Sequence, residues 1–136
     1  MAAAGYTLSH GTPTVGADGH TDPHTRSVVI GSHLPALEQV ATLAHELAHI
    51  ALGHCAPNYA YHAHRGRAEV EAESVAYVLL GACGIDMTDA PIRYVAGWAG
   101  GDIDTIRAAA ATVTTTAKAV LDAVLDTDTD TDAAAA

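Results

Sequence analysis

The chain has 136 residues, which fits one domain, and 49% of them are hydrophobic, although Phe is absent and Trp occurs once. The formal net charge is -10, and the six basic residues are scattered rather than clustered, which argues against a nucleic-acid-binding surface. We find no secretory signal and no apolar run near the roughly 20 residues of a membrane span. With only two cysteines, the chain is expected to be cytoplasmic and reduced, with no direct nucleic-acid partner and no membrane contact.

The first third of the chain predicts one strand and one helix after an irregular start. Residues 1–24 are rich in Gly, Pro, Thr and His without periodicity, which is typical of an irregular lead-in. A β-branched run at residues 26–30, closed by Gly31, predicts a strand. Apolar residues at three- and four-residue spacing predict a helix over residues 35–52, with Pro35 in its first turn and Gly53 at its end. A strand in this place could be a sheet edge that receives an extended peptide.

The rest of the chain is predicted to be mostly helical. Residues 55–66 predict a loop, and residues 67–80 a buried helix, because apolar positions surround most of its circumference. A short helix is expected at 91–98, and a long amphipathic helix after Asp102. The Asp-Thr repeat and the alanines of 126–136 predict a disordered tail. The predicted fold is therefore α+β and mostly helical, with one folded domain over residues 25–125.

The segment His45-Glu46-Leu47-Ala48-His49 lies inside the first predicted helix and has the pattern H-E-x-x-H. The four-residue spacing places both imidazoles on one face, about one turn apart, where they can bind one Zn²⁺. Glu46 faces a neighbouring sector and can reach a water molecule on the metal without being a ligand. Two His and a Glu on a buried face would be costly polar groups if no metal were bound. We therefore predict zinc ligands at His45 and His49.

A catalytic zinc needs a third protein ligand, and the second predicted helix offers three carboxylates. Glu69 and Glu73 are four residues apart and share a face with Tyr77, whereas Glu71 points about 200° away from Glu69. We assign Glu69 to the metal and Glu73 to the outer ring nitrogen of a ligand His, although the ligand role could be permuted among these glutamates. Glu71 could be solvated or could pair with Arg65 or Arg67.

His54 follows His49 by five residues and is expected at the helix end rather than on the metal. A partly charged imidazole is favoured at such a position by the helix dipole. An oxyanion stabiliser is also expected near the metal, and the spacing does not rank its candidates. They are Tyr77, Tyr59, Tyr61, His62 and His64, and we assign the catalytic role to Tyr77, which shares a face with Glu69 and Glu73.

The two motifs together resemble a known group of metallopeptidases. The segment from Thr42 to His49, followed by Glu69-Val70-Glu71-Ala72-Glu73-Ser74-Val75-Ala76, is similar to gluzincins of the ImmA/IrrE type and to the metallopeptidase domain of ArdC-like antirestriction proteins. The resemblance implies a small zincin-like domain with Glu69 as third ligand and Glu73 outside the ligand shell. Members of the ImmA/IrrE type often have Asn at the place of Glu73, so the chain looks closer to the ArdC-like branch.

The expected activity is hydrolysis of a protein or peptide substrate by a zinc-activated water, with Glu46 as general base. The alternative is a non-cleaving, metal-bound interaction module that sequesters a regulator or a restriction enzyme. A third reading, a purely structural zinc site, predicts no open coordination position. The sequence leaves the substrate and the oligomeric state open.

Overall fold

Three strands and three helices make up the part of the chain that the computed structural model describes, residues 4–14, 16–87 and 103–134. In chain order they are β1 (Thr7–Gly11), β2 (Gly19–Asp22), β3 (Ser27–Gly31), α1 (Ala36–Ala51), α2 (Tyr61–Ala82) and α4 (Ile103–Ala134). This architecture confirms the expected α+β, mostly helical fold of a small zincin-like domain. The short helix expected at 91–98 lies outside the described residues.

The sheet has the strand order β1-β3-β2, with β1 parallel and β2 antiparallel to the central strand. Val28 and Ile30 of β3 alternate with less buried neighbours and are almost completely buried, so β3 is the strand that the β-branched run predicted. The lead-in was expected to be irregular, and this expectation is wrong where it covers β1 and β2. Neither strand shows an apolar alternation, and β2 (Gly-His-Thr-Asp) contains no apolar side chain. Backbone pairing with β3 therefore defines these strands.

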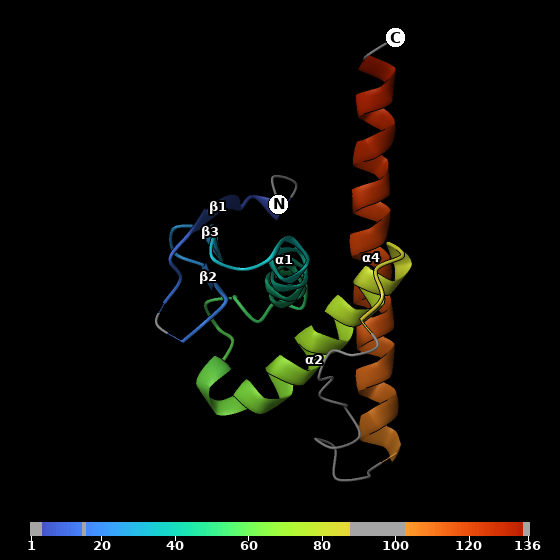
Figure 1. Ribbon diagram of the computed structural model, residues 1–136. Coiled ribbons are helices and arrows are strands. Elements are labelled where there is room, and N and C mark those ends of the chain that lie inside the picture. The colour runs from blue at the N-terminus through green and yellow to red at the C-terminus, as the bar shows by residue number, and fades with distance from the viewer. Residues whose placement is uncertain (1–3, 15, 88–102, 135–136) are drawn as a thin grey trace.

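Helix α1 lies between the sheet and the other two helices, as Figure 1 shows with α1 viewed along its axis. One core lies on its sheet side, where Val28, Ile30 and Leu34 pack with Leu43 and Ile50. A second core lies on its other side and joins α1 to α2 and α4. Its buried members are Ala48, Ala72, Val75, Leu79, Val113 and Ala117. Because both sides of α1 are covered, its polar residues can be enclosed between neighbouring elements.

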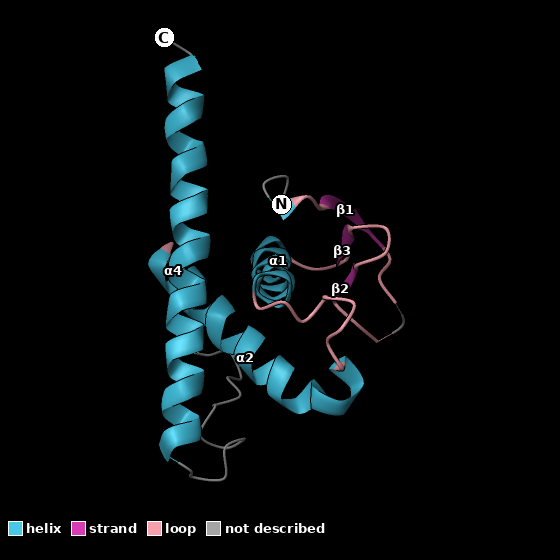
Figure 2. Ribbon diagram, turned by 180° about the vertical axis from the view of Figure 1, so that it is seen from behind, coloured by secondary structure: helices cyan, strands magenta, loops and turns pink. Residues whose placement is uncertain are grey.

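The ends of α2 and α4 differ from the sequence expectation. The segment 61–66 was expected to be a loop, but α2 begins at Tyr61 and contains a non-helical residue, His64, after its first turn. This break, together with Gly66, explains why the sequence lacked a clear helical period there. The tail was expected to be disordered, yet α4 continues to Ala134 and its C-terminal half projects beyond the rest of the molecule (Figure 2).

Helix α4 contains an apolar run of the length that the sequence was expected to lack. Residues Ile106–Leu125 of α4 form a helical segment whose length and mean hydropathy of 1.3 would suffice for a membrane span. The core helix of a water-soluble domain can pass the same test; only 17% of this segment is buried, but its face with Ala109, Val113 and Ala117 packs against neighbouring elements. The segment is therefore weak evidence for membrane contact, and the expectation of no membrane partner stays a prediction.

Candidate metal centre

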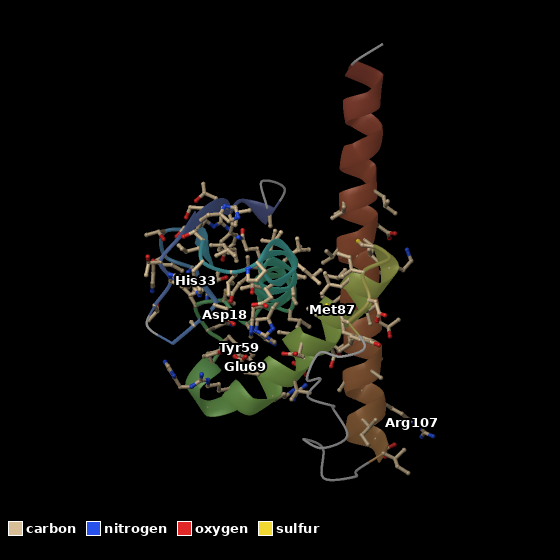
Figure 3. The ribbon with its side chains drawn as sticks, viewed as in Figure 1. Asp18, His33, Tyr59, Glu69, Met87 and Arg107 are labelled. Atoms are coloured by element: carbon tan, nitrogen blue, oxygen red, sulfur yellow. The ribbon has the colours of Figure 1, made fainter. Side chains whose placement is uncertain are left out.

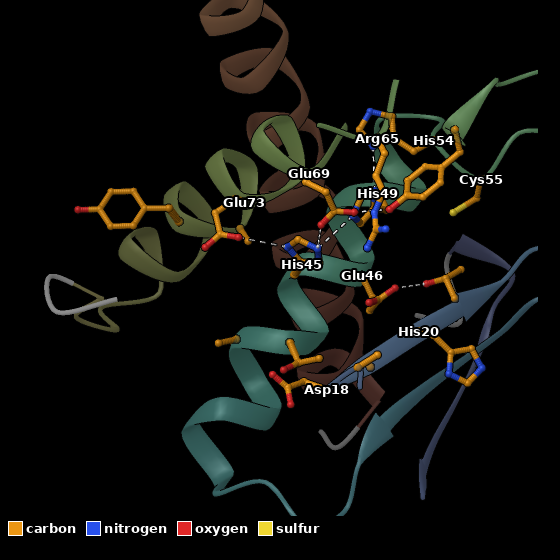
Figure 4. Close-up of a pocket in the computed structure, with 18 of the residues that line it drawn as sticks. Asp18, His20, His45, Glu46, His49, His54, Cys55, Arg65, Glu69 and Glu73 are labelled. Atoms are coloured by element: carbon orange, nitrogen blue, oxygen red, sulfur yellow. Dashed lines mark hydrogen bonds and ion pairs between the residues drawn. The ribbon is translucent and has the colours of Figure 1, made fainter. Parts of the chain in front are cut away.

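The two imidazoles of α1 meet one carboxylate of α2. His45 Nε2 lies 3.0 Å from His49 Nε2 and 3.4 Å from Glu69 Oε2, and His49 Nε2 lies 3.7 Å from Glu69 Oε1. Figure 4 shows His45 and His49 projecting from α1 toward Glu69 on the crossing helix. The three residues that the motif spacing singled out therefore form one cluster, whose ligand atoms all lie within 4.8 Å of one another.

The donor set and its spacing suit a divalent metal of the zinc type. In a tetrahedral zinc site with bonds of about 2.0–2.1 Å, neighbouring ligand atoms lie about 3.3 Å apart. The observed separations of 3.0, 3.4 and 3.7 Å bracket that value. Two neutral imidazoles and one carboxylate would hold the ion and leave a fourth position open, as in catalytic sites. The side chains present therefore fit the expected ion.

The three residues of the cluster differ in how readily each holds a proton. Burial and, to a smaller extent, the neighbouring His45 lower the pKa of His49 to about 4. Burial also lowers the pKa of His45, but the hydrogen bond to Glu69 and the charges of Glu46, Glu69 and Glu73 outweigh it, so the net shift is upward. The hydrogen bond with His45 brings the pKa of Glu69 down to about 2 against the opposing effect of burial. His45 is therefore the member of the cluster that holds a proton most readily.

Glu46 lies on the side of α1 that faces the strands, apart from the three ligand candidates (Figure 4). Its Oε2 accepts a 2.6 Å hydrogen bond from the hydroxyl of Thr21 on β2. Strand β2 can approach α1 this closely because Gly19 has no side chain, since a Cβ there would lie 2.6 Å from Thr42 Cγ2. The sequence analysis missed Thr21, because a four-residue strand without apolar side chains has no hydrophobic signature.

The outer nitrogens of the two His have different partners. His45 Nδ1 lies 3.8 Å from Glu73 Oε2, which places Glu73 where it was expected, although at long distance. His49 Nδ1 lies 2.9 Å from Nδ1 of His54, and His54 Nε2 lies 3.3 Å from Glu71 Oε2. The position of His54 at the helix end agrees with the sequence analysis, but its expected partial charge does not, because burial lowers its pKa.

Glu71 is buried and accepts a 2.7 Å hydrogen bond from Arg67 Nε. Pairing with Arg67 was one of the alternatives left open for this residue. It also explains how a carboxylate is tolerated on the buried side of α2 while Glu69 and Glu73 face His45. The three glutamates are thus divided between the two faces that the helical period predicted.

Tyr61 is the aromatic hydroxyl next to the ligands. It donates a hydrogen bond to Glu69 Oε1, and burial, followed by the interaction with Glu69, raises its pKa to about 12. Tyr77, the residue assigned to catalysis from the sequence, lies about two turns beyond Glu69 along α2 and is 43% exposed. Tyr59 instead packs against the ring of His54, with centroids 4.9 Å apart.

A cavity of about 840 Å³ opens on the cluster. It extends from Asp18 beside β2, past Glu69, to Met87 beyond the end of α2, whereas Arg107 lies far away at the start of α4 (Figure 3). Among the predicted oxyanion candidates, Tyr61, His62 and Tyr77 line this cavity, and Arg65, which the sequence analysis did not propose for this role, lines it as well. A space of this size, with polar groups converging on one point, is suited to a substrate segment.

The fold and the cluster define a small α+β domain with a candidate metal centre between two packed helices. Residues 9–92, more than half of the chain, match the peptidase M78 family, described as the IrrE N-terminal-like domain. The chain therefore belongs to this family, and its domain is of the metallopeptidase type. This confirms the resemblance to the ImmA/IrrE type, whereas the closer likeness to ArdC-like proteins stays a prediction. No curated protein and no solved structure matches the chain.

Proposed function

We propose that the chain is a zinc-dependent peptidase that hydrolyses peptide bonds of a protein or peptide substrate in the cytoplasm, with Glu46 as general base. A zinc ion held by His45, His49 and Glu69 would lower the pKa of a water molecule and polarise the carbonyl under attack. One observation carries the proposal: Glu46 lies beside the ligand cluster in the same cavity, but it is bonded to Thr21 and not to the ligands.

Glu46 is suited to the transfer of protons. Thr21 occupies one carboxylate oxygen, so the other oxygen is available to accept a proton from the attacking water. The same carboxyl group can then give that proton to the amine that leaves. A carboxylate with a fixed orientation loses little freedom when the substrate binds, which favours this double role.

Tyr61 and Arg65 are the donors that we propose for the developing negative charge on the substrate oxygen. Tyr61 keeps its proton over the whole physiological range because its pKa is raised to about 12, chiefly by burial. Its single O–H donates to Glu69, and it would turn to the substrate oxygen once Glu69 binds the metal. Arg65 adds a permanent positive charge to the lining of the same cavity. Preorganised donors of this kind stabilise a transition state more than the ground state. In this role Tyr61 replaces Tyr77.

The non-cleaving interaction module is less well supported. A module that only sequesters a partner requires no carboxylate beside the open side of a metal site and no cavity leading to it. The structural zinc site is disfavoured for a related reason, since only His45, His49 and Glu69 form a ligand cluster among the described residues. A structural site usually has four protein ligands.

The test is the substitution Glu46→Gln, which keeps the shape of the side chain and removes its basicity. Casein and a mixture of peptides of diverse sequence serve as substrates, with products identified by mass spectrometry and zinc measured by elemental analysis. We expect cleavage to fall by a factor of about 100 or more, while zinc remains bound. Asp104→Asn, the same chemical change on an exposed residue of α4, should leave both unchanged. Undiminished cleavage by Glu46→Gln would refute the base assignment.

A further inference from the structure

We propose that His54, Glu71 and Arg67 form a supporting triad that fixes His49 in the one tautomer able to bind a metal. This inference rests on the proposed metal centre but not on peptidase activity. It assigns a positioning role to three residues outside the ligand cluster of His45, His49 and Glu69. The contacts that carry it run in series, from Arg67 through Glu71 and His54 to His49.

The backbone at the end of α1 brings His54 back under His49. Gly53 adopts a φ of 76°, the left-handed conformation that ends many helices. The amide of Gly53 then donates to the carbonyl of Ile50 at 3.1 Å, and the amide of His54 donates to the carbonyl of His49 at 3.0 Å. This pair of bonds is the Schellman motif. His54 is therefore tied to His49 through its backbone as well as through its ring.

The hydrogen bonds leave one consistent assignment of protons. A metal bound at His49 Nε2 requires that this nitrogen carry no proton, so the proton of the neutral ring must be on Nδ1. Nδ1 of His49 then donates to Nδ1 of His54, 2.9 Å away, which leaves the proton of His54 on Nε2. That proton points to Glu71 Oε2 at 3.3 Å. The opposite tautomer of His54 would place two N–H groups against each other at His49.

Burial makes this assignment strict. The side chains of His54 and Glu71 are 2% and 7% exposed, so water cannot easily replace either partner. Arg67 donates to the buried carboxylate of Glu71 through Nε at 2.7 Å and supplies its counter-charge. The charge of Glu71 in turn favours the proton on the near nitrogen of His54. Arg67 is half exposed, so the series ends at the protein surface.

The two ligand histidines are therefore supported unequally. His45 has Glu73 as its outer partner at 3.8 Å, and the side chain of Glu73 is 34% exposed. His49 has a shorter contact, 2.9 Å, to a buried ring. Partners of this kind typically contribute a factor of 10 to 100 to metal affinity. We expect the larger part of that effect on the His49 side.

The test compares the zinc affinity of four proteins by competition with a chromophoric chelator, without any assay of cleavage. They are the unaltered chain and its His54→Ala, His54→Asn and His54→Gln variants. The amide oxygen of Asn can take the place of His54 Nδ1 and accept the hydrogen bond from His49. The longer side chain of Gln instead places its amide group near Glu71 and leaves His49 without an acceptor. We expect His54→Ala and His54→Gln to weaken zinc binding by about 10- to 100-fold, and His54→Asn to stay within a few-fold of the unaltered chain.

Two further measurements separate positioning from general damage. Nitrogen-15 NMR of the histidine rings in the zinc-loaded protein should show the proton of His49 on Nδ1 and that of His54 on Nε2. Thermal unfolding of the metal-free variants identifies any that fail to fold, in which case Glu71→Gln takes the place of His54→Ala. His10→Ala, a change of the same size at an exposed residue of β1, should leave zinc affinity unchanged.

Each outcome decides the inference. Equal zinc affinity of His54→Ala and the unaltered chain would overturn it, as would a His54→Asn variant no better than His54→Ala. A chain that binds zinc tightly and shows the expected variant series, but cleaves nothing, would overturn the peptidase proposal and leave the triad standing. A chain that binds no zinc would overturn both.

Discussion

The hydroxyl of Thr21 donates a 2.6 Å hydrogen bond to Glu46, and this bond joins the edge strand β2 to the helix that carries His45 and His49. The proposed general base is therefore oriented by the sheet, while the candidate ligands are oriented by the second helix and the end of the first. Thr21 is close to Gly19, whose lack of a side chain allows β2 to approach α1. The orientation of Glu46 is thus a property of how the strand packs on the helix.

Removal of the Thr21 hydroxyl should lower turnover without removing zinc. Thr21→Val keeps the shape of the side chain but loses the donor, and a hydrogen bond to a charged group contributes about 1.5–3 kcal/mol. If about half of that energy is used to orient Glu46 in the transition state, kcat falls by about 4- to 13-fold. Thr21→Ser, which retains the hydroxyl, should recover most of the turnover. Steady-state kinetics and zinc content decide, and a Thr21→Val enzyme with unchanged kcat would contradict the role.

The three glutamates of α2 should differ when each is replaced by Ala. Glu69→Ala should lose zinc outright, because Glu69 is the carboxylate that contacts both His45 and His49. Glu71→Ala should weaken zinc binding through His54, and Glu73→Ala should change it least because its contact is long and partly exposed. Elemental analysis after dialysis against a weak chelator ranks the three. If Glu73→Ala lost zinc and Glu69→Ala retained it, the ligand assignment would be wrong.

Two glycine substitutions should change stability in opposite directions. Gly53→Ala forces a left-handed φ of 76° on a residue with a side chain and should lower the free energy of unfolding by about 1 kcal/mol. Gly81 lies inside α2 with open space around its missing side chain, so Gly81→Ala should raise the free energy of unfolding by about 0.5–1 kcal/mol. Urea unfolding measures both, and equal effects of the two changes would contradict the helix end described for α1.

Acid should destabilise the metal-free protein in a defined range. Burial lowers the pKa of His49 from 6.5 to about 4, so between these values the unfolded chain binds this proton and the folded chain does not. The free energy of unfolding should therefore fall as the pH decreases from 6.5 to about 4. His45 does not oppose this trend, because its pKa is raised and it is protonated in both states below 6.5. The contribution of protonated His45 to the free energy of unfolding is lost only as the pH rises above 6.5.

This prediction is checked by urea unfolding of chelator-treated protein at several pH values. A His49→Asn variant serves as the control, since the part of the slope that His49 produces should disappear from it. Glu69 should add a second loss of stability at lower pH, below 4.5, because its folded pKa is brought down to about 2, chiefly by the hydrogen bond with His45. A slope that persists unchanged in His49→Asn would show that other groups cause it.

The main helices and the cluster of His45, His49 and Glu69 could be predicted from the sequence because both depend on the helical period. The 3.6-residue repeat defined the helix that carries His45 and His49, and the same repeat separated Glu69 and Glu73 from Glu71. Gly53 marked the end of α1 for a comparable reason, since its conformational freedom is a local property.

The missed features depend on contacts between distant segments. Strands β1 and β2 form by pairing with β3, and their sequences lack the alternation of apolar residues that would predict a strand. Thr21 meets Glu46 across 25 residues of sequence. The contact between His54 and His49 could have been predicted more easily, because Gly53 at the helix end turns the following His54 back under the last turn. Burial then keeps it neutral, a result that the helix dipole alone did not suggest.

The alternation of partners along Glu69, Glu71 and Glu73 has a consequence for variation in chain length. Each residue added or removed between positions 69 and 73 would turn the following part of α2 by about 100° relative to α1. Glu73 would then leave His45, and the residues that pack beneath it in the second core would rotate toward solvent. Insertions and deletions should consequently be excluded from this stretch.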